Sequence, residues 1–277
     1  MNAVALQRSY LYVPAHKPEL FAKALAGGAD ALVLDLEDGV PPGEKEVARR
    51  HVAEFLASAA AKPTWVRLNA ADSPQFAADV AAAASPHLAG VRLPKAERAE
   101  DVRRLGALLA GAGARGVPLA PLVESAVGVA AIGDLAAVDG VAMLALGEAD
   151  LAADLGVEGE EGLADARARC VLASRLAGLL PPPQSVYTDL ADADGLRRST
   201  ERGRRLGFFG RSLIHPSQIE TVNAVHTPDA AKVEWARSAI SAAGEGDAVL
   251  GGVYVDAPGV RAARRVLALA DRFGAAS

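Results

Sequence analysis

The sequence predicts an α/β protein: a (β/α)8 TIM barrel with a C-terminal helix–hairpin–helix appendage. Short apolar runs rich in β-branched residues alternate with longer stretches rich in Ala, Leu, Arg and Glu, which is the pattern of βα units on a parallel sheet. Eight such units fit within about 225 residues, the usual size of this barrel. The phosphate-binding fingerprint GxGxxG is absent, which argues against an open dinucleotide-binding sheet.

Eight segments are expected to form the strands. In chain order they are Tyr10–Val13, Ala31–Leu36, Thr64–Leu68, Gly90–Leu93, Pro118–Val123, Ala142–Leu146, Ser185–Tyr187 and Gly207–Phe209. The segments between them have room for helices, and several carry helix start signals: Pro18, the Glu44–Glu46 cluster, Ser73-Pro74, and Ser217 with Glu220 three residues later.

The pattern changes after Thr227-Pro228. Asp229–Ala243 predicts a helix, the stretch AGEGDAVLGGVYVDAPG predicts a glycine-rich loop or hairpin, and Gly259–Phe273 predicts a final helix. We therefore expect a barrel catalytic domain over residues 1–227 and an appendage over residues 228–277. Packing on a neighbouring subunit is one use for such an appendage.

Composition and charge narrow the function. The chain has 277 residues and a formal net charge of −5, which argues against nucleic-acid binding because that requires a basic surface. No apolar stretch approaches the roughly 18 residues of a membrane helix. The N-terminus lacks the pattern of a secretory signal, so we expect a cytoplasmic protein without a membrane partner. Cys170 is the single cysteine; it forbids an internal disulfide, and we expect it to be a packed apolar side chain.

Polar side chains follow most of the predicted strands. In a parallel barrel, residues just past the carboxyl ends of the strands line one shared mouth. The residues found there are Glu37, Asp38, Arg67, Lys95, Glu124, Asp150, Asp189 and His215. Carboxylates mixed with cations predict an anionic, metal-binding site, because carboxylates alone would repel one another.

The carboxylates indicate a hard cation. Oxygen ligands without a Cys or His cluster favour Mg2+, bound through one or two carboxylates and water. Glu124 and Asp150 end adjacent strands and are the predicted ligands, while Glu37 and Asp38 would hydrogen-bond the metal's water molecules. Asp35 lies inside the strand and is interpreted as a structural anchor. Taken singly, Glu124 is also compatible with a helix N-cap partner, and Asp150 with a solvated loop carboxylate.

Arg67 stands inside a strand, in TWVRLNA, where a guanidinium needs an anionic partner. A structural salt bridge and a clamp for an α-keto acid are both open, and we favour the clamp. His215, before a proline at a strand end, fits a structural hydrogen-bonder better than a general base.

The motifs in combination carry a resemblance to a known family. The strings are RSYLYVPA, GADALVLDLEDGVPPGEKEVAR, WVRLN, GVRLPKAE, PLVESAVGV, LALGEADL, GRSLIHPSQI and GVYVDAPGVRAARRVL, in this order from Arg8 to about Leu267. The chain closely resembles the citrate lyase beta subunit family, within the wider group of HpcH/HpaI aldolases. The resemblance implies a Mg2+-dependent barrel lyase that cleaves or forms a carbon–carbon bond beside a thioester.

The same resemblance implies roles for individual residues. Glu124 and Asp150 match the metal ligands, Arg67 matches the group that holds the keto acid or nascent carbonyl, and Glu37 and Asp38 match residues around the metal's waters. Asp256, in GVYVDAPG, matches a position that enters the active site of an adjacent subunit. A homotrimer or homohexamer is therefore expected.

The N-terminal stretch resembles part of a coenzyme A binding surface, and its residues are Arg8, Tyr12, His16 and Lys17. Two positions depart from the family's pattern. Arg211 stands where many relatives have lysine, and Ala15 where many have glycine. Both departures concern contacts on the thioester side and leave the metal site untouched.

The expected substrate is a 3-hydroxyacyl thioester of the citryl-, malyl- or citramalyl-CoA type. Its cleavage would release an acyl thioester and an α-keto acid of the oxaloacetate, glyoxylate or pyruvate class. Three alternatives stay open: a malyl-CoA thioesterase, a CoA-independent pyruvate-type aldolase, and a non-autonomous subunit of a citrate lyase complex acting on an acyl-carrier thioester.

Overall fold

The computed structural model describes residues 5–243 and 248–274. The chain divides into two compact units, Met1–Val222 and Asn223–Ser277, and each is described by itself. Among the described residues, no helix combines the length and the apolar character that crossing a membrane requires.

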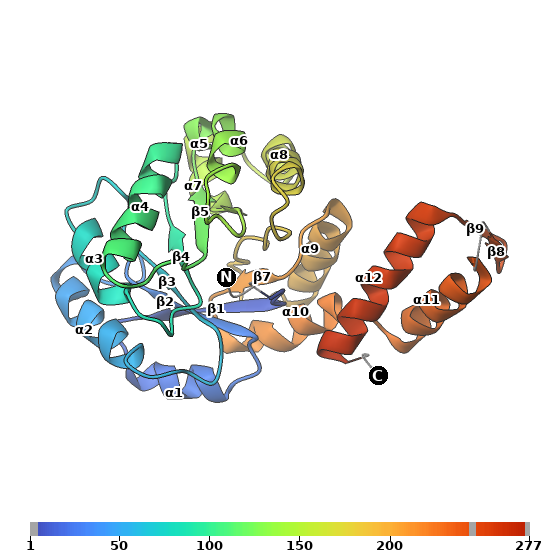
Figure 1. Ribbon diagram of the computed structural model, residues 1–277, viewed down its shortest axis with the longest axis horizontal. Helices are drawn as coiled ribbons and strands as arrows, with labels where there is room; N and C mark the ends of the chain where they lie inside the picture. The colour runs from blue at the N-terminus through green and yellow to red at the C-terminus, as the bar shows by residue number, and fades with distance from the viewer. Residues whose placement is uncertain (1–4, 244–247, 275–277) are drawn as a thin grey trace. The chain divides into compact units, whose positions relative to one another are not determined.

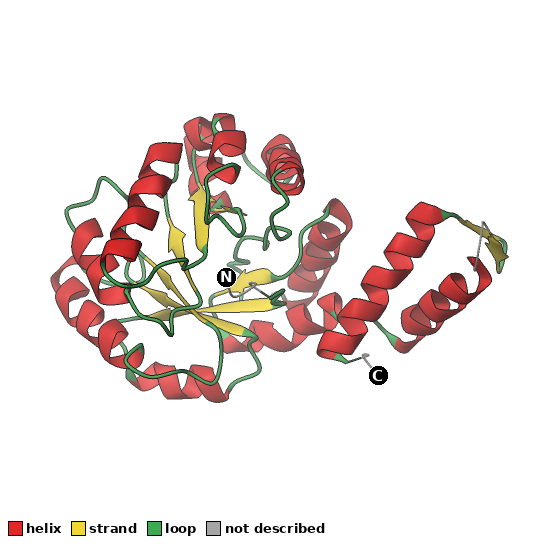
Figure 2. Cartoon of the chain, in the orientation of Figure 1, coloured by secondary structure: helices red, strands yellow, loops and turns green. Residues whose placement is uncertain are grey.

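The first unit is built on a curled parallel sheet of seven strands in the order β6-β5-β4-β3-β2-β1-β7, with helices around its outer side (Figures 1 and 2). The strands are β1 (Ser9–Pro14), β2 (Ala31–Asp35), β3 (Thr64–Arg67), β4 (Gly90–Leu93), β5 (Leu119–Val123), β6 (Ala145–Leu146) and β7 (Arg211–Leu213). This is a TIM-barrel-like α/β fold, as predicted at that level.

The strands form because their side chains are buried on both faces. Every residue of β2, β4 and β5 is buried. Leu32 and Leu34 belong to the large cluster shared with the helices, whereas Ala31 and Val33 belong to a small cluster with Trp65. Each large apolar side chain buried in this way contributes roughly 1.5–3 kcal/mol to folding. The run ALVLD is therefore apolar at consecutive positions, which is typical of a central parallel strand.

The helices of the first unit alternate with the strands. They are α1 (Glu19–Ala26), α2 (Lys45–Phe55), α3 (Phe76–Ala83), α4 (Ala99–Gly111), α5 (Ala126–Ala130), α6 (Ile132–Ala136), α7 (Glu148–Leu155), α8 (Ala164–Leu176) and α9 (Ala193–Leu206), with α10 (Ile219–His226) at the boundary to the second unit. In α4, Val102, Leu105 and Leu109 are buried, as expected for one apolar stripe of a helix. Cys170 is buried within α8, as predicted.

Two predicted strands are wrong. Gly207–Phe209 follows α9 directly, and Gly207 (φ 102°) ends that helix in a left-handed conformation, its N–H bonded to the carbonyls of Gly203 and Arg204. A glycine in this conformation is a common helix end, so the apolar residues after it belong to a loop. The strand itself, β7, begins at Arg211.

Ser185–Tyr187 is also irregular. The neighbouring segment, residues 180–184, lies between β6 and β7 without forming a regular strand: Leu180 N donates to Ala142 O (3.0 Å), and Gln184 N donates to Gly210 O (2.9 Å). Pro181, Pro182 and Pro183 have no N–H to donate, so a continuous ladder cannot form here. An isolated bridge from Gln184 to Arg211 takes its place.

The second unit contains α11 (Ala230–Ala243), β8 (Ala248–Leu250), β9 (Val253–Val255) and α12 (Ala257–Phe273). β8 and β9 pair in antiparallel fashion across Gly251 (φ 57°) and Gly252 (φ 81°), the positive φ values that a tight two-residue hairpin requires. The two helices pack through small residues, among them Ala236, Ala239 and Ala263. Residues 244–247 of the predicted glycine-rich hairpin stretch lie outside the described residues.

Candidate active site

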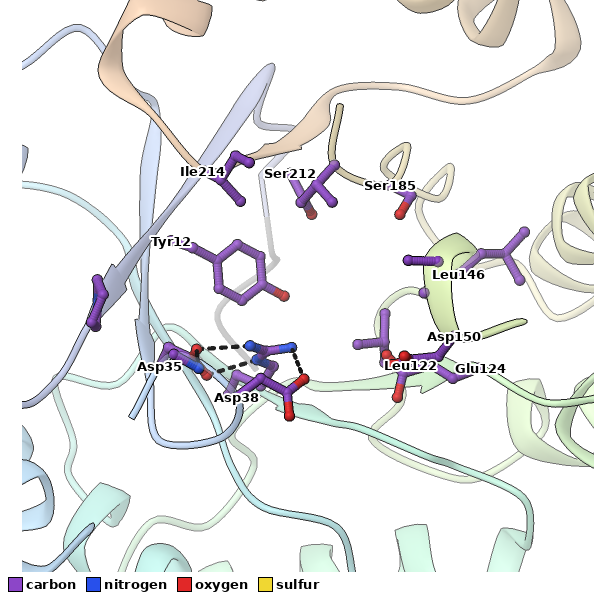
Figure 3. Close-up of a pocket in the computed structure, with 16 residues that line it drawn as sticks. Tyr12, Asp35, Asp38, Leu122, Glu124, Leu146, Asp150, Ser185, Ser212 and Ile214 are labelled. Atoms are coloured by element: carbon purple, nitrogen blue, oxygen red, sulfur yellow. Dashed lines mark hydrogen bonds and ion pairs between the residues drawn. The ribbon is translucent and has the colours of Figure 1, made fainter. Parts of the chain in front are cut away.

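A pocket of about 350 Å³ opens at the carboxyl ends of the strands (Figure 3). Its polar lining comes from segments far apart in the sequence: Tyr12, Asp35, Asp38, Arg67, Glu124, Asp150, Ser185 and Ser212. The fold therefore brings together most of the carboxylates predicted for the mouth, together with Arg67.

Glu124 and Asp150 lie side by side on one wall of this pocket (Figure 3). Glu124 follows β5, and Asp150 stands in the first turn of α7, which follows the adjacent strand β6. Gly147, between β6 and α7, leaves room for Glu124, because a Cβ at this glycine would overlap the Glu124 carboxylate. The carboxylate is buried while Asp150 is exposed.

The surroundings of Glu124 disfavour its ionised form. Burial raises the pKa of Glu124 to about 7, opposed by the N–H of Lys95 and reinforced by the charge of Asp150. Lys95 has φ 51°, and its N–H donates to Glu124 Oε2 at 2.9 Å. A cation between Glu124 and Asp150 would relieve both the burial cost and the repulsion.

Glu37 is a second buried carboxylate without full compensation. Burial raises its pKa to about 8, although Arg67 and Lys95 act against the shift. Arg67 Nη1 lies 3.0 Å from Oε2, and Lys95 Nζ lies 3.6 Å from Oε1. Neither contact has hydrogen-bond geometry, and within the described residues both Glu37 oxygens lack a hydrogen-bond donor. They are therefore able to accept hydrogen bonds from water.

Asp38 is largely exposed, with its Oδ2 3.7 Å from Arg67 Nη1. It lies on the pocket side of the loop after β2, as Figure 3 shows. Glu37 and Asp38 thus flank the pocket but stand on a different strand end from Glu124 and Asp150.

Arg67 forms the structural salt bridge that the sequence left open. Its Nε and Nη2 each lie 2.7 Å from an oxygen of Asp35, a two-point contact (Figure 3). Burial works to lower the pKa of Arg67, but the hydrogen bonds and charge of Asp35 outweigh it, and the net shift is upward. Asp35 also accepts from the N–H groups of Glu37 and Gly39, so it is an anchor as predicted. Nη1 of Arg67 remains directed at Glu37 and Asp38.

The residues predicted for coenzyme A are not gathered in one place. Arg8 precedes β1, at the end of the strand opposite the pocket, and pairs with Asp30 at 2.8 Å. Tyr12 lines the pocket itself. His16 and Lys17 lie in the turn after β1; His16 Nε2 is 3.9 Å from Glu44, and Lys17 is exposed.

The remaining predicted residues have local structural roles in this structure. Asp256 belongs to the second unit, where its Oδ1 caps α12 by accepting from Gly259 N at 2.9 Å. His215 is exposed and its Nδ1 accepts from Ser217 N, consistent with the structural interpretation. Asp189 accepts from the backbone N–H groups of a turn.

Sequence reasoning missed Ser185 and Ser212, which line the pocket, and Arg92, which is buried behind Tyr12 and Ser212. Arg92, in GVRL, carried the same signal as Arg67, a charged side chain within an apolar strand. Ser212 was missed because β7 was placed too early in the chain.

The donor set suits magnesium. In the described part of the chain, His, Cys, Asp and Glu side chains do not gather in groups of three or more that could hold a metal ion. Glu124 and Asp150 instead offer two carboxylates in an open pocket, and Mg2+ is commonly held by one or two carboxylates with the remaining positions taken by water and substrate. Glu37, with unmet acceptors nearby, fits the role of orienting such water molecules.

The chain is similar to known proteins over nearly its whole length. A (3S)-malyl-CoA thioesterase from Cereibacter sphaeroides is 35% identical over 279 residues, covering 97% of this chain and 96% of the relative. Citrate lyase subunit beta from Leuconostoc mesenteroides subsp. cremoris is 34% identical, covering 98% and 95%.

A solved structure is similar over the same length. Protein CitE from Mycobacterium tuberculosis, in complex with magnesium, acetoacetate and coenzyme A, superposes with a TM-score of 0.81 at 31% identity and 98% coverage of each chain. The family model described as HpcH/HpaI aldolase/citrate lyase matches residues 8–216. The chain belongs to the HpcH/HpaI aldolase/citrate lyase family.

Proposed function

We propose that this protein is a Mg2+-dependent carbon–carbon lyase acting on a 3-hydroxyacyl thioester of the citryl-, malyl- or citramalyl-CoA type. The observation that carries the proposal is the convergence of Glu124, a buried carboxylate with a raised pKa, and Asp150 on one wall of the pocket that Arg67 also lines. Relatives named for citrate lyase and malyl-CoA activities, and one solved with magnesium, acetoacetate and coenzyme A, support the thioester assignment.

The chemistry follows from the placement of charge. Glu124 and Asp150 would hold Mg2+, which supplies Lewis acidity toward the hydroxyl and carboxylate oxygens of the substrate. Arg67, fixed by Asp35, presents Nη1 to the pocket and stabilises negative charge that develops on the hydroxyl oxygen. Glu37 and Asp38 accept hydrogen bonds from water and keep it oriented.

Cleavage of the C–C bond would be a step of the retro-Claisen type. The hydroxyl proton leaves to solvent, the C–O bond becomes the keto carbonyl, and the electron pair of the broken C–C bond passes to the α-carbon of the thioester. Asp256 of an adjacent subunit, or a water within its reach, protonates that carbon; in the synthetic direction the same group removes the proton.

The remaining predictions extend this proposal. Residues 1–227 would form a complete (β/α)8 barrel, residues 228–277 would pack on a neighbouring subunit, and the assembly would be a homotrimer or homohexamer. His16 and Lys17, in the turn after β1, are retained as predicted coenzyme A contacts, whereas the ion pair of Arg8 with Asp30 favours a structural role for Arg8. The cytoplasmic location stays a prediction.

The direct test is a product assay of the purified protein with Mg2+ and each of citryl-, malyl- and citramalyl-CoA, in which keto acid is scored against free thiol. We expect keto acid and acyl thioester, with activity lost on chelation. Glu124→Gln and Asp150→Asn should each lower the rate at least about 100-fold, because each removes a charge that holds the ion. Asp165→Asn, at an exposed carboxylate of α8, is the matched control. Full Mg2+-dependent activity in the Glu124→Gln protein would contradict the assignment.

Hydrolysis of malyl-CoA is the second candidate, favoured by the 35% identical relative named for that activity. It predicts free coenzyme A and malate with no keto acid. The same assay separates the two, because cleavage of the C–C bond leaves the thioester intact whereas hydrolysis releases thiol.

A further inference from the structure

In the part of the chain that the structure describes, Arg92 is a buried cation without an anionic partner. It lies in β4 and is 1% exposed. Its Nη1 donates to Tyr12 Oη (3.0 Å) and Ser212 Oγ (2.8 Å), and both acceptors are neutral hydroxyls. Over the residues that the structure describes, Arg92 forms no ion pair, and its Nε and Nη2 are buried without a hydrogen-bond partner.

This arrangement differs from that of Arg67, which is the residue paired with Arg92 on the adjacent strand β3. Arg67 has the Asp35 carboxylate in a two-point contact. Arg92 has two aromatic rings instead, with Cζ 4.7 Å from the centroid of Tyr10 and 5.3 Å from that of Tyr12. Aromatic faces attract a cation more weakly than a carboxylate does, so the positive charge inside the sheet stays largely uncompensated.

The hydroxyls of Tyr12 and Ser212 lie between the Arg92 guanidinium and the pocket. An O–H group that accepts a hydrogen bond from Arg92 keeps its own hydrogen for donation. Tyr12 and Ser212 both line the pocket, and Figure 3 shows them apart from the wall of Glu124 and Asp150. The described residues offer neither hydroxyl hydrogen an acceptor. The Tyr12 ring also lies under Arg67, whose Cζ is 4.9 Å from its centroid.

We propose that Tyr12 and Ser212, backed by Arg92, bind a second carboxylate of the substrate, away from the reacting hydroxyl. The inference rests on the proposed function and narrows it: the keto acid formed has two carboxylates, as in the oxaloacetate class, and monocarboxylates of the pyruvate or glyoxylate class are bound less well. Tyr12 then belongs to the acid pocket rather than to a coenzyme A surface.

Three features support a dicarboxylate. A bound carboxylate would accept from two O–H donors and neutralise the charge of Arg92, which makes the hydrogen bonds charge-assisted. The wall of Glu124 and Asp150 is anionic, so it repels a second carboxylate unless a cation is bound there. The pocket, at about 350 Å³, has room for a four-carbon acid between the two walls.

The test compares two acids that differ at one end. Oxaloacetate and 2-oxobutyrate share the keto-acid end, but the first ends in a carboxylate and the second in a methyl group. Calorimetric titration of the full chain with Mg2+ present should give tighter binding of oxaloacetate, by about tenfold or more. No thioester is needed, so the measurement does not depend on turnover.

Variants identify the residues. Ser212→Ala and Tyr12→Phe should each weaken oxaloacetate binding about tenfold and 2-oxobutyrate binding less than about threefold, and Arg92→Met should abolish the preference. Ser185→Ala is the matched control, since it removes another pocket hydroxyl that has no contact with Arg92 and should leave the preference unchanged. Because Arg92→Met alters a buried site, thermal unfolding accompanies each variant, and the two hydroxyl variants carry the test on their own.

The contrary outcomes are distinct. The proposal is overturned if the wild-type protein binds oxaloacetate and 2-oxobutyrate equally well. It is also overturned if Ser212→Ala and Tyr12→Phe weaken the binding of both acids by the same factor. Failure of the lyase function appears differently, as the absence of turnover with every thioester while the binding preference persists.

Discussion

Asp35 and Arg67 show how a buried strand tolerates charge. Asp35 is 3% exposed and accepts four hydrogen bonds, two from Arg67 and two from the backbone of the loop that carries Glu37 and Asp38. The pair is therefore both a structural link between β2 and β3 and the support that aims Arg67 Nη1.

We predict that Asp35→Asn lowers the free energy of unfolding by about 3 kcal/mol, because it keeps the shape but leaves Arg67 without its principal anion. Urea denaturation measures the change. Asp165→Asn, which breaks the exposed pair with Arg169, should have no measurable effect. A loss in Asp35→Asn no greater than in that control would show that Glu37 and Asp38 suffice to compensate Arg67.

The raised pKa values of Glu124, about 7, and Glu37, about 8, predict a pH dependence of Mg2+ binding. Of the two, Glu124 is the predicted ligand; it is protonated in the metal-free protein below about pH 7, whereas Mg2+ requires an ionised ligand. Affinity should therefore rise between pH 6 and 8, with release of about one proton on binding near pH 6.5. Calorimetry in two buffers of different ionisation enthalpy counts the protons. Affinity that is flat over this range would contradict the shifts.

The same pKa values determine how the free energy of unfolding of the metal-free protein changes with pH. Between the ordinary pKa of 4.5 and about 8, the native state binds protons that the unfolded chain has released, so unfolding becomes easier as the pH rises through this window. Saturating Mg2+ should remove this trend.

At the scale of elements, the junction of β6 and α7 positions the metal ligands. Gly147 lies against Glu124, and Asp150 stands in the first turn of the helix that follows. Gly147→Ala should displace the Glu124 carboxylate and weaken Mg2+ binding about 10–100-fold. Gly133→Ala in α6, where a Cβ meets no atom within 4 Å, is the control and should bind Mg2+ normally. Equal Mg2+ affinity in the two variants would show that Gly147 does not position the Glu124 carboxylate.

The elements also show where pattern reasoning works. β1 to β4 were predicted to within a residue or two, since strands buried on both faces leave continuous apolar runs. The last two units were misplaced because their signals conflict. Gly207 ends a helix just before the apolar pair Phe208-Phe209, which has the composition of a strand. The three prolines at 181–183 precede the expected strand Ser185–Tyr187 and have no N–H to donate, and this part of the chain forms only an isolated bridge at Gln184.

At the scale of the whole molecule, the proposal that Asp256 serves an adjacent subunit has a direct test. Glu124→Gln and Asp256→Asn should each be inactive alone, while co-refolded mixtures should recover about a quarter of the wild-type activity, because a site with both native residues then arises between unlike subunits. Asparagine also caps helices, so Asp256→Asn should keep α12 intact. Mixtures that stay inactive would place the acid elsewhere.

The sequence alone determined the fold class, the mouth that collects the polar residues, and the candidate ligands Glu124 and Asp150, because apolar periodicity and strand-end position are local properties. Only the tertiary structure decided that Arg67 is held by Asp35, that Tyr12 faces the pocket, and that Arg92 donates to the hydroxyls of Tyr12 and Ser212. Those relations join residues on different strands. The charge balance inside the curled sheet depends on which side chains meet there, and no local sequence pattern records this.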